Sequence, residues 1–210
     1  GHATRGHRFM GSQHIEVRRF EDYALKLARE FVMVDATARA ETIRTEARNL
    51  AFAQGLELIE DEGLLKETAG LVEWPVVLMG SFDESFLSVP PEVIATSIKN
   101  HQKCFALRNA STGKLSNRYL LVSNLIARDG GKTIIAGNNK VIAARLSDAK
   151  FFWDQDRKTP LLSRLAALQE ITFQAKLGTL AERVTRIEKL AVALVDLAKL
   201  AADREQVRLT

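Results

Sequence analysis

The stretch Cys104-Phe-Ala-Leu-Arg-Asn-Ala-Ser-Thr-Gly-Lys-Leu-Ser-Asn-Arg-Tyr-Leu-Leu-Val122 carries the clearest fold signal in the chain. Two apolar runs, residues 104–107 and 119–122, flank a segment from Asn109 to Gly113 that is rich in turn-forming residues. This arrangement predicts a β-hairpin with a long turn. The chain is therefore expected to contain antiparallel strands.

Helices and short strands are predicted on the N-terminal side of this hairpin. Asp35 is a good N-cap for a helix that runs to Gln54, and Gly55 provides its stop. Trp74-Pro75 favours a strand directly after it, because proline lacks a backbone donor and cannot lie inside a helix. The expected helices cover residues 19–30, 35–54, 61–69 and a segment from Pro90 into the block 99–103; the expected strands cover 15–17, 31–34 and 76–79, with a turn and a short extended piece over 82–88.

The strand signals stop at about Asn138. We expect a helix from there to about Arg157, a break at Thr159-Pro160, a helix over 161–168 and a long amphipathic helix from residue 178 to about 200. The C-terminal third is thus predicted to be all helical, and the fold class is α+β. We place a boundary near residue 155, between an α+β domain at 1–155 and the truncated start of a helical domain at 156–210.

The composition is that of a globular protein. The 210 residues are 46% apolar, which is enough for a core. There is no run of about 18 apolar residues and no secretory segment at the start, so we expect a soluble, cytoplasmic protein without a membrane segment. The one cysteine, Cys104, excludes an internal disulfide and fits a reducing compartment.

The charge balance is mildly basic. The net charge of +4 permits a polyanionic partner without requiring one. The cations gather in patches, which are Arg5/Arg8, Arg18/Arg19, Lys99/Lys103, Arg157/Lys158 and Arg183/Arg186.

Complete nucleotide-binding and hydrolase motifs are absent from the sequence. Residues 130–133, Gly-Gly-Lys-Thr, resemble the end of a phosphate-binding loop but lack its first glycine. His101 and Cys104 would need two further ligands to bind zinc. A lone cysteine at the start of a strand is usually a small buried residue, not a nucleophile. We therefore assign no catalytic and no metal-binding residue.

Three polar or aromatic segments leave alternatives open. The block Lys99–Lys103 suits either RNA, through two ammonium groups and two amides, or a solvated helix end. Arg5, His7 and Arg8 suit either RNA contact or a disordered basic arm. Phe151-Phe-Trp153 could stack on bases, although aromatic residues at helical spacing are more typical of a core.

Several blocks together resemble one family, the β subunit of the bacterial heterotetrameric glycyl-tRNA synthetase. Their order and spacing over nearly the whole chain carry the resemblance. The blocks are Gly6-His-Arg-Phe9, Leu71-Val-Glu-Trp-Pro75, Val89-Pro90, Gln102-Lys103 with Phe105, Gly137-Asn138 with Lys140-Val141, Arg145-Leu146 with Asp148-Ala149 and Phe151-Phe152, and Lys176-Leu-Gly-Thr-Leu180.

The resemblance implies an α2β2 ligase that attaches glycine to tRNA(Gly). In that family the α subunit binds glycine, ATP and Mg²⁺, whereas the β subunit recognises tRNA, so no cofactor is expected in this segment. The resemblance further implies an α+β portion similar to the editing domain of the phenylalanyl-tRNA synthetase β subunit. The start of a helical domain similar to the His-Asp (HD) phosphohydrolases would follow it, and the anticodon-binding domain would lie beyond.

Departures from the family pattern weigh against additional activities. Gln174 stands where many relatives have histidine, which argues against a working phosphohydrolase site. Cys104 stands where relatives often have tyrosine, which argues against a catalytic thiol. Glycine is the smallest amino acid, so hydrolytic editing of smaller products would have no substrate.

The sequence therefore favours a tRNA-binding and scaffolding segment that is not catalytic by itself. The alternatives are half of a metal-dependent HD-type phosphohydrolase, or a pure subunit-contact scaffold without RNA contact. The candidates for contact with the tRNA backbone, chosen by charge and block position, are Arg5, Arg8, Lys99, Asn100, Lys103, Lys140, Arg145, Arg157 and Lys158.

Overall fold

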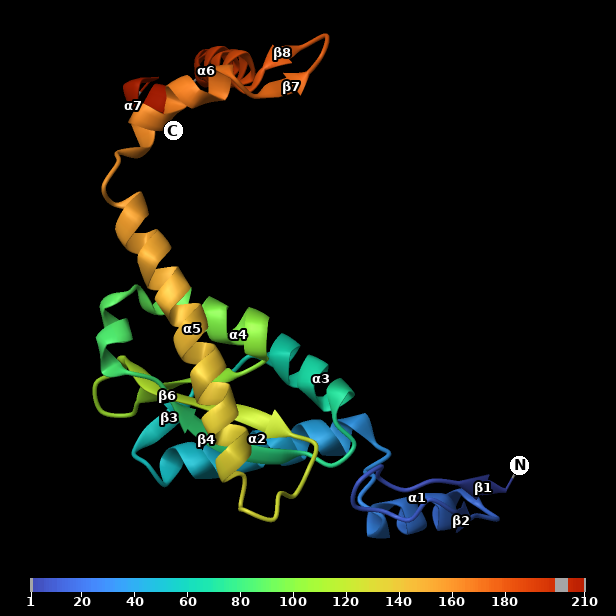
Figure 1. The fold of residues 1–210 in the computed structure, drawn as a ribbon. Coiled ribbons are helices and arrows are strands. Elements are labelled where there is room, and N and C mark those ends of the chain that lie inside the picture. Colours follow the sequence, from blue (N-terminus) through green and yellow to red (C-terminus); the bar gives the residue numbers. More distant parts are fainter. Residues whose placement is uncertain (1, 199–203, 210) are drawn as a thin grey trace. The chain divides into compact units, whose positions relative to one another are not determined.

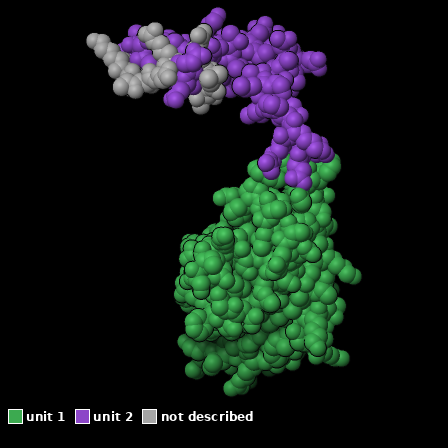
Figure 2. Space-filling view, turned by 90° about the vertical axis from the view of Figure 1, so that its left-hand side faces the viewer, with its two compact units in different colours: residues 1–153 green, residues 154–210 purple. Residues whose placement is uncertain are grey.

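The chain forms two compact units in the computed structural model, which describes residues 2–198 and 204–209. Unit 1 comprises residues 1–153 and unit 2 residues 154–210 (Figure 2). Together they contain helices and antiparallel sheets, so the mixed α and β character is confirmed.

A four-stranded sheet in the order β3-β5-β6-β4 forms the centre of unit 1. Its strands are β3 (Leu56–Leu58), β4 (Val76–Ser81), β5 (Phe105–Asn109) and β6 (Leu115–Ser123). All neighbouring strands are antiparallel. β5 and β6 are the hairpin expected from the sequence, whereas the short edge strand β3 was not anticipated.

Helices cover both faces of this sheet (Figure 1). They are α2 (Ala36–Phe52) and α3 (Glu62–Leu71) on one face, and α4 (Pro91–Gln102) and α5 (Lys132–Asp156) on the other. Strand residues alternate between the two faces, so that Leu107 packs with α2 and α3 while Ala106 packs with α4 and α5. Unit 1 therefore has two apolar cores, one on each face of the sheet.

The cap that the sequence suggested for α2 is present, and α3 has a cap of the same kind. The Asp35 carboxylate accepts a hydrogen bond from the Thr37 N–H at 2.8 Å, and the Asp61 carboxylate accepts one from the Leu64 N–H at 2.9 Å. Gly55, in the turn after α2, has a φ of +67°, a backbone conformation that favours glycine.

The strand expected at 31–34 is wrong. Phe31 has a φ of +59°, and the Val32 N–H donates to the Leu27 carbonyl at 2.8 Å, which closes the end of α1 (Phe20–Arg29). The Met33 N–H donates to the Glu73 carbonyl at 2.9 Å. The apolar run thus ends a helix and crosses to α3 instead of joining a sheet.

Two other boundaries differ from expectation. Residues 84–88 form a 3₁₀ helix, η1 (Glu84–Ser88), because the Asp83 carboxylate accepts from the Ser85 N–H and starts a helical turn. α5 begins at Lys132, six residues before the expected start, because the Asp129 carboxylate accepts from the N–H groups of Gly131 and Thr133.

The N-terminal residues are ordered. β1 (Ala3–Thr4) pairs with β2 (Ile15–Glu16) in an antiparallel ladder, so the alternative of a disordered basic arm is wrong. α1 follows and ends at Arg29.

Unit 2 contains a short hairpin as well as helices, so the expectation of an all-helical C-terminal third is wrong. Gly178 has a φ of +81°, and the Thr179 hydroxyl accepts from the Glu182 N–H, which places the start of the long helix after the hairpin. The elements are η2 (Leu161–Gln169), β7 (Thr172–Gln174), β8 (Gly178–Thr179), α6 (Leu180–Leu197) and α7 (Arg204–Leu209). The expected helix end at residue 200 lies outside the described residues.

Candidate nucleic-acid interface

The two lysines of the block 99–103 are ion-paired. Lys99 Nζ lies 2.5 Å from an Asp61 carboxylate oxygen, and Lys103 Nζ lies 2.8 Å from a Glu67 carboxylate oxygen. Both lysine side chains remain partly exposed, at 45% and 40%. These pairs tie α4 to α3. Asn100, between them, is exposed and ends in solvent.

The Lys99 pair has an electrostatic consequence for Asp61. The hydrogen bond from Lys99 lowers the pKa of the Asp61 carboxyl, and the Leu64 N–H lowers it further, whereas partial burial opposes both. Asp61 therefore both caps α3 and holds α4.

Four other candidates form no ion pair within the described part of the chain. Their side chains are exposed, and they lie at the N-terminus and on α5. They are Arg5, Arg8, Lys140 and Arg145. A phosphate would meet these cations without displacing a carboxylate.

The N-terminal cations belong to a tightly held loop, residues 6–12: Arg5 directly precedes it and Arg8 lies within it. The Gly6 N–H donates to the Ser12 carbonyl at 2.8 Å, and the Gly11 N–H donates to the His7 carbonyl at 2.8 Å. Both ends of the loop also bind Glu30, since the His7 N–H donates to its carbonyl and the Ser12 N–H to its carboxylate. The loop 6–12 is therefore held in place by backbone hydrogen bonds and by Glu30.

His7 lies buried in this loop and is 1% exposed. Its Nδ1 accepts from the N–H groups of Phe9 and Met10, at 3.2 and 3.3 Å. The following two positions point outward: Phe9 is 74% exposed, and the Arg8 guanidinium lies 5.4 Å from its ring centroid. The loop thus presents a cation and an aromatic ring together.

A cavity of about 550 Å³ lies beside the loop, within unit 1. His7, Arg8 and Phe9 form one side of it, and the end of α3 forms another. Arg39 fixes this wall, because its guanidinium donates to the carbonyls of Ala69, Met33 and Val34.

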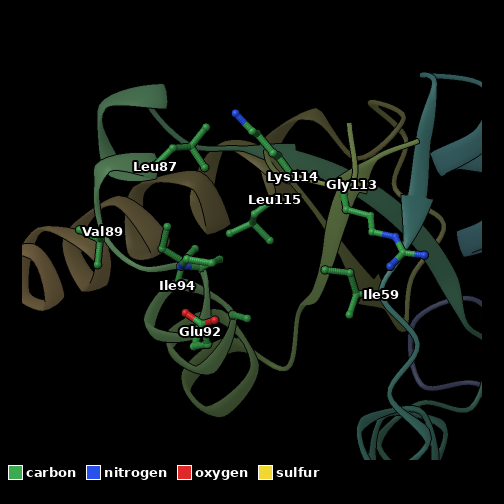
Figure 3. A pocket seen from close by; sticks show the side chains of 11 residues that line it. Ile59, Leu87, Val89, Glu92, Ile94, Gly113, Lys114 and Leu115 are labelled. Carbon is green, nitrogen blue, oxygen red and sulfur yellow. The ribbon is translucent and has the colours of Figure 1, made fainter. Parts of the chain in front are cut away.

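A second cavity, of about 560 Å³, lies between η1, α4 and the β5–β6 turn (Figure 3). Its walls are mainly aliphatic, with Leu87, Ile94 and Leu115 toward the hollow. Arg108 also lines this cavity and is already paired with Glu57 at 2.9 Å. It contains no aromatic ring on which a base could stack.

Cys104 is buried, and burial raises the pKa of its thiol to about 12. The described residues contain no group of three histidine, cysteine, aspartate or glutamate side chains arranged to hold a metal ion. No helix within the described ranges is long and apolar enough to cross a bilayer.

A model of the family described as glycyl-tRNA synthetase beta subunit matches residues 1–209. The chain belongs to this family. A curated relative from Paracoccus denitrificans (strain Pd 1222), named glycine–tRNA ligase beta subunit, is 50% identical over 209 residues, which are 98% of this chain and 30% of that protein. A relative of the same name from Phenylobacterium zucineum (strain HLK1) is 55% identical over 192 residues, 91% of this chain and 29% of that protein. The chain thus spans less than a third of either relative's length.

In this synthetase β-subunit segment, the exposed face of α5 carries more than its two cations. Val141 is 41% exposed, and Phe151 and Phe152 are 57% and 63% exposed with their ring centroids 5.5 Å apart. The expectation that these phenylalanines belong to the core is wrong; of the three aromatic residues in that run, Trp153 packs against the core. The helix turns positions 142 and 146 inward and these residues outward.

The last two candidates, Arg157 and Lys158, belong to unit 2 and are exposed. The nine candidates therefore fall into separate groups: the N-terminal loop, the α4 block, the α5 face and the start of unit 2.

Sequence reasoning named His7, with Arg5 and Arg8, as a possible RNA contact, but it did not single out Phe9 as an exposed neighbour of Arg8. Phe9 was recognised only within the block Gly6-His-Arg-Phe9 of the family resemblance. Two glycines, Gly6 and Gly11, with an arginine and an aromatic residue between them, were the available signal for a tight loop that presents side chains.

Proposed function

We propose that this chain is a tRNA-binding and scaffolding segment of the glycine–tRNA ligase β subunit, which supports the ATP-dependent attachment of glycine to tRNA(Gly). The observation that carries the proposal is the family match over residues 1–209. The four exposed cations without ion pairs, Arg5, Arg8, Lys140 and Arg145, support RNA contact, because cations of this kind meet phosphates at little cost.

The partners follow from the same proposal. The α subunit would supply the site for glycine, ATP and Mg²⁺ within an α2β2 assembly, and the β subunit would supply RNA contacts. We also assign unit 1 to the editing-domain-like fold and unit 2 to the start of the HD-like domain, with the functional boundary near residue 155. The sheet covered by helices on both faces and the compact units at 1–153 and 154–210 are compatible with these assignments.

The test uses charge reversal on the α5 face of the complete ligase. Lys140→Glu/Arg145→Glu should raise the apparent KM for tRNA by roughly tenfold, because two phosphate contacts become repulsive. Glycyl-adenylate formation, measured by pyrophosphate exchange, should be unchanged.

The matched control is Lys66→Glu/Lys114→Glu, which reverses two exposed lysines of unit 1 that form no ion pair among the described residues. It should leave the KM for tRNA within about twofold. Equal KM values for both double variants and the wild type would contradict RNA contact by α5 and favour a subunit-contact scaffold.

A further inference from the structure

We propose that the loop 6–12 and the cavity beside it bind one unpaired nucleotide of the RNA. In this arrangement the base stacks on Phe9, its phosphate meets Arg8, and a base acceptor receives the hydrogen bond of His7 Nε2–H. The proposal rests on the proposed function and deepens it, because it names a site and a ligand class within the RNA interface.

The His7 ring provides the donor of this hydrogen bond. Its Nδ1 accepts two backbone hydrogen bonds, from Phe9 and Met10, so the ring proton lies on Nε2. This Nε2–H is buried and has no acceptor among the described residues. Buried donors are nearly always paired, so the structure holds a donor without an acceptor in a residue that lines the cavity.

The loop is built to hold this donor in place. A Cβ on Gly6 would lie 2.6 Å from the Glu30 Cβ, and one on Gly11 would lie 2.5 Å from the Glu30 carbonyl oxygen. Only glycine fits at either position. The close packing against Glu30 fixes the backbone that carries His7, Arg8 and Phe9.

The cavity offers the remaining contacts that a base needs. Phe9 and Tyr23 both line it and supply aromatic surface. The Asn124 side-chain oxygen accepts from the N–H groups of Glu73 and Trp74, whereas its amide NH₂ has no acceptor among the described residues. Its volume of about 550 Å³ lies within the range of ligand pockets.

The combination of an exposed aromatic ring, an arginine and a buried donor without an acceptor favours an RNA nucleotide as the ligand. Unpaired bases are recognised by stacking on aromatic rings and by hydrogen bonds to their edges, and their phosphates are bound by arginine. The aliphatic cavity beside α4 has no ring and no unpaired buried donor. A free mononucleotide shares this chemistry with an RNA nucleotide, so the experiment must separate the two sources.

The first experiment measures tRNA(Gly) binding to the complete ligase with variants of the exposed residues, which leave the buried loop contacts intact. Phe9→Ala should raise the Kd by about fivefold or more, because a stacking contact is lost, whereas Phe9→Trp should stay within about twofold. The matched control is Phe52→Ala, which removes an 84% exposed ring at the end of α2 and should not change the Kd.

The second experiment measures the salt dependence of binding. Arg8→Gln should reduce the slope of log K against log salt concentration by about one, while Phe9→Ala should leave the slope unchanged. Ultraviolet crosslinking of bound tRNA should attach a nucleotide to the loop 6–12 in the wild type and not in Phe9→Ala.

The outcomes distinguish the two proposals. A steep salt slope with an unchanged Kd for Phe9→Ala would overturn the nucleotide site and leave RNA binding by the chain intact. A crosslink of adenosine or guanosine monophosphate to the loop 6–12, without any crosslink of tRNA to the same loop, would show that the site binds a free mononucleotide and would overturn the assignment to an RNA nucleotide. No binding of tRNA to the ligase would overturn the proposed function itself.

Discussion

At the scale of one residue, burial makes the Cys104 thiol unreactive as a nucleophile. The thiol is 1% exposed, and its Sγ donates to the Gln102 carbonyl at 3.4 Å. Burial raises the pKa of the thiol to about 12, so the thiol is protonated at pH 8. The thiolate is the reactive form, so the residue is an inert part of the core between the sheet and α4.

We predict that Cys104 resists labelling in the folded protein. At pH 8 a disulfide reagent such as dithionitrobenzoate should react slowly with the native chain, and adding denaturant should release one thiol per chain. Absorbance of the released thionitrobenzoate measures this. Rapid stoichiometric labelling without denaturant would show that the thiol is accessible and contradict the buried position.

At the same scale, the structure shows why the burial of His7 could not be predicted from sequence. The loop that holds the ring depends on Glu30, which binds both ends of the loop from a position 23 residues along the chain. No local sequence pattern predicts the contact between Glu30 and the loop. Arg8, by contrast, was chosen as a candidate by its charge and its position in a family block, and neither criterion needs long-range information.

Asp61 joins two elements, because it caps α3 and pairs with Lys99 of α4. We predict that Asp61→Ala destabilises the chain by about 1–2 kcal/mol, since both the cap and the ion pair are lost. Asp61→Asn keeps a capping oxygen and should cost less than about 1 kcal/mol. Urea unfolding at pH 7 measures both, and equal losses would contradict the capping role.

The direction in which pH changes the stability of the folded chain follows from the same contacts of Asp61. The pKa of Asp61 is lower in the folded chain than its ordinary value of 3.8, chiefly because of the hydrogen bond from Lys99. The ionised pair therefore contributes fully above about pH 4, and its contribution is lost as the pH falls through the lowered pKa. The stability difference between wild type and Asp61→Asn should narrow over that acidic range and stay constant between pH 5 and pH 7.

Element prediction succeeded where local signals and packing agreed. The β5–β6 hairpin was found because its two apolar runs and its turn residues lie close together, and α2 was found from Asp35 and Gly55. β3 was missed and the segment 31–34 was wrongly predicted as a strand, each for its own reason. β3 has only three residues and pairs with β5 about fifty residues later, while the apolar run at 31–34 is turned away from any sheet by the positive φ of Phe31.

At the scale of the whole molecule, the two units differ in how much side chain they bury. Unit 1 contains two clusters of buried apolar residues, one on each face of its sheet. In the described part of unit 2, Val195 alone is buried, and α6 keeps Ile187, Leu190 and Leu194 more than half exposed. Local stability follows buried apolar contact, so the units should open independently and to different extents.

Hydrogen exchange of the chain, read by mass spectrometry, tests this difference. Peptides from α2, β5 and β6 should exchange most slowly, because their amides open only when the cores of unit 1 unfold. Peptides from η2, β7 and β8 should exchange roughly tenfold faster or more, since 3₁₀ turns and a two-stranded hairpin with exposed side chains open at little cost.

The control is Ile43→Ala, which creates a cavity in the core of unit 1 at a 0% exposed position and should lower the free energy of unfolding by about 2–5 kcal/mol. Ile43→Ala should speed hydrogen exchange throughout unit 1 and leave the exchange rates in unit 2 unchanged. Equal acceleration in both units would show that the two units unfold as one cooperative body.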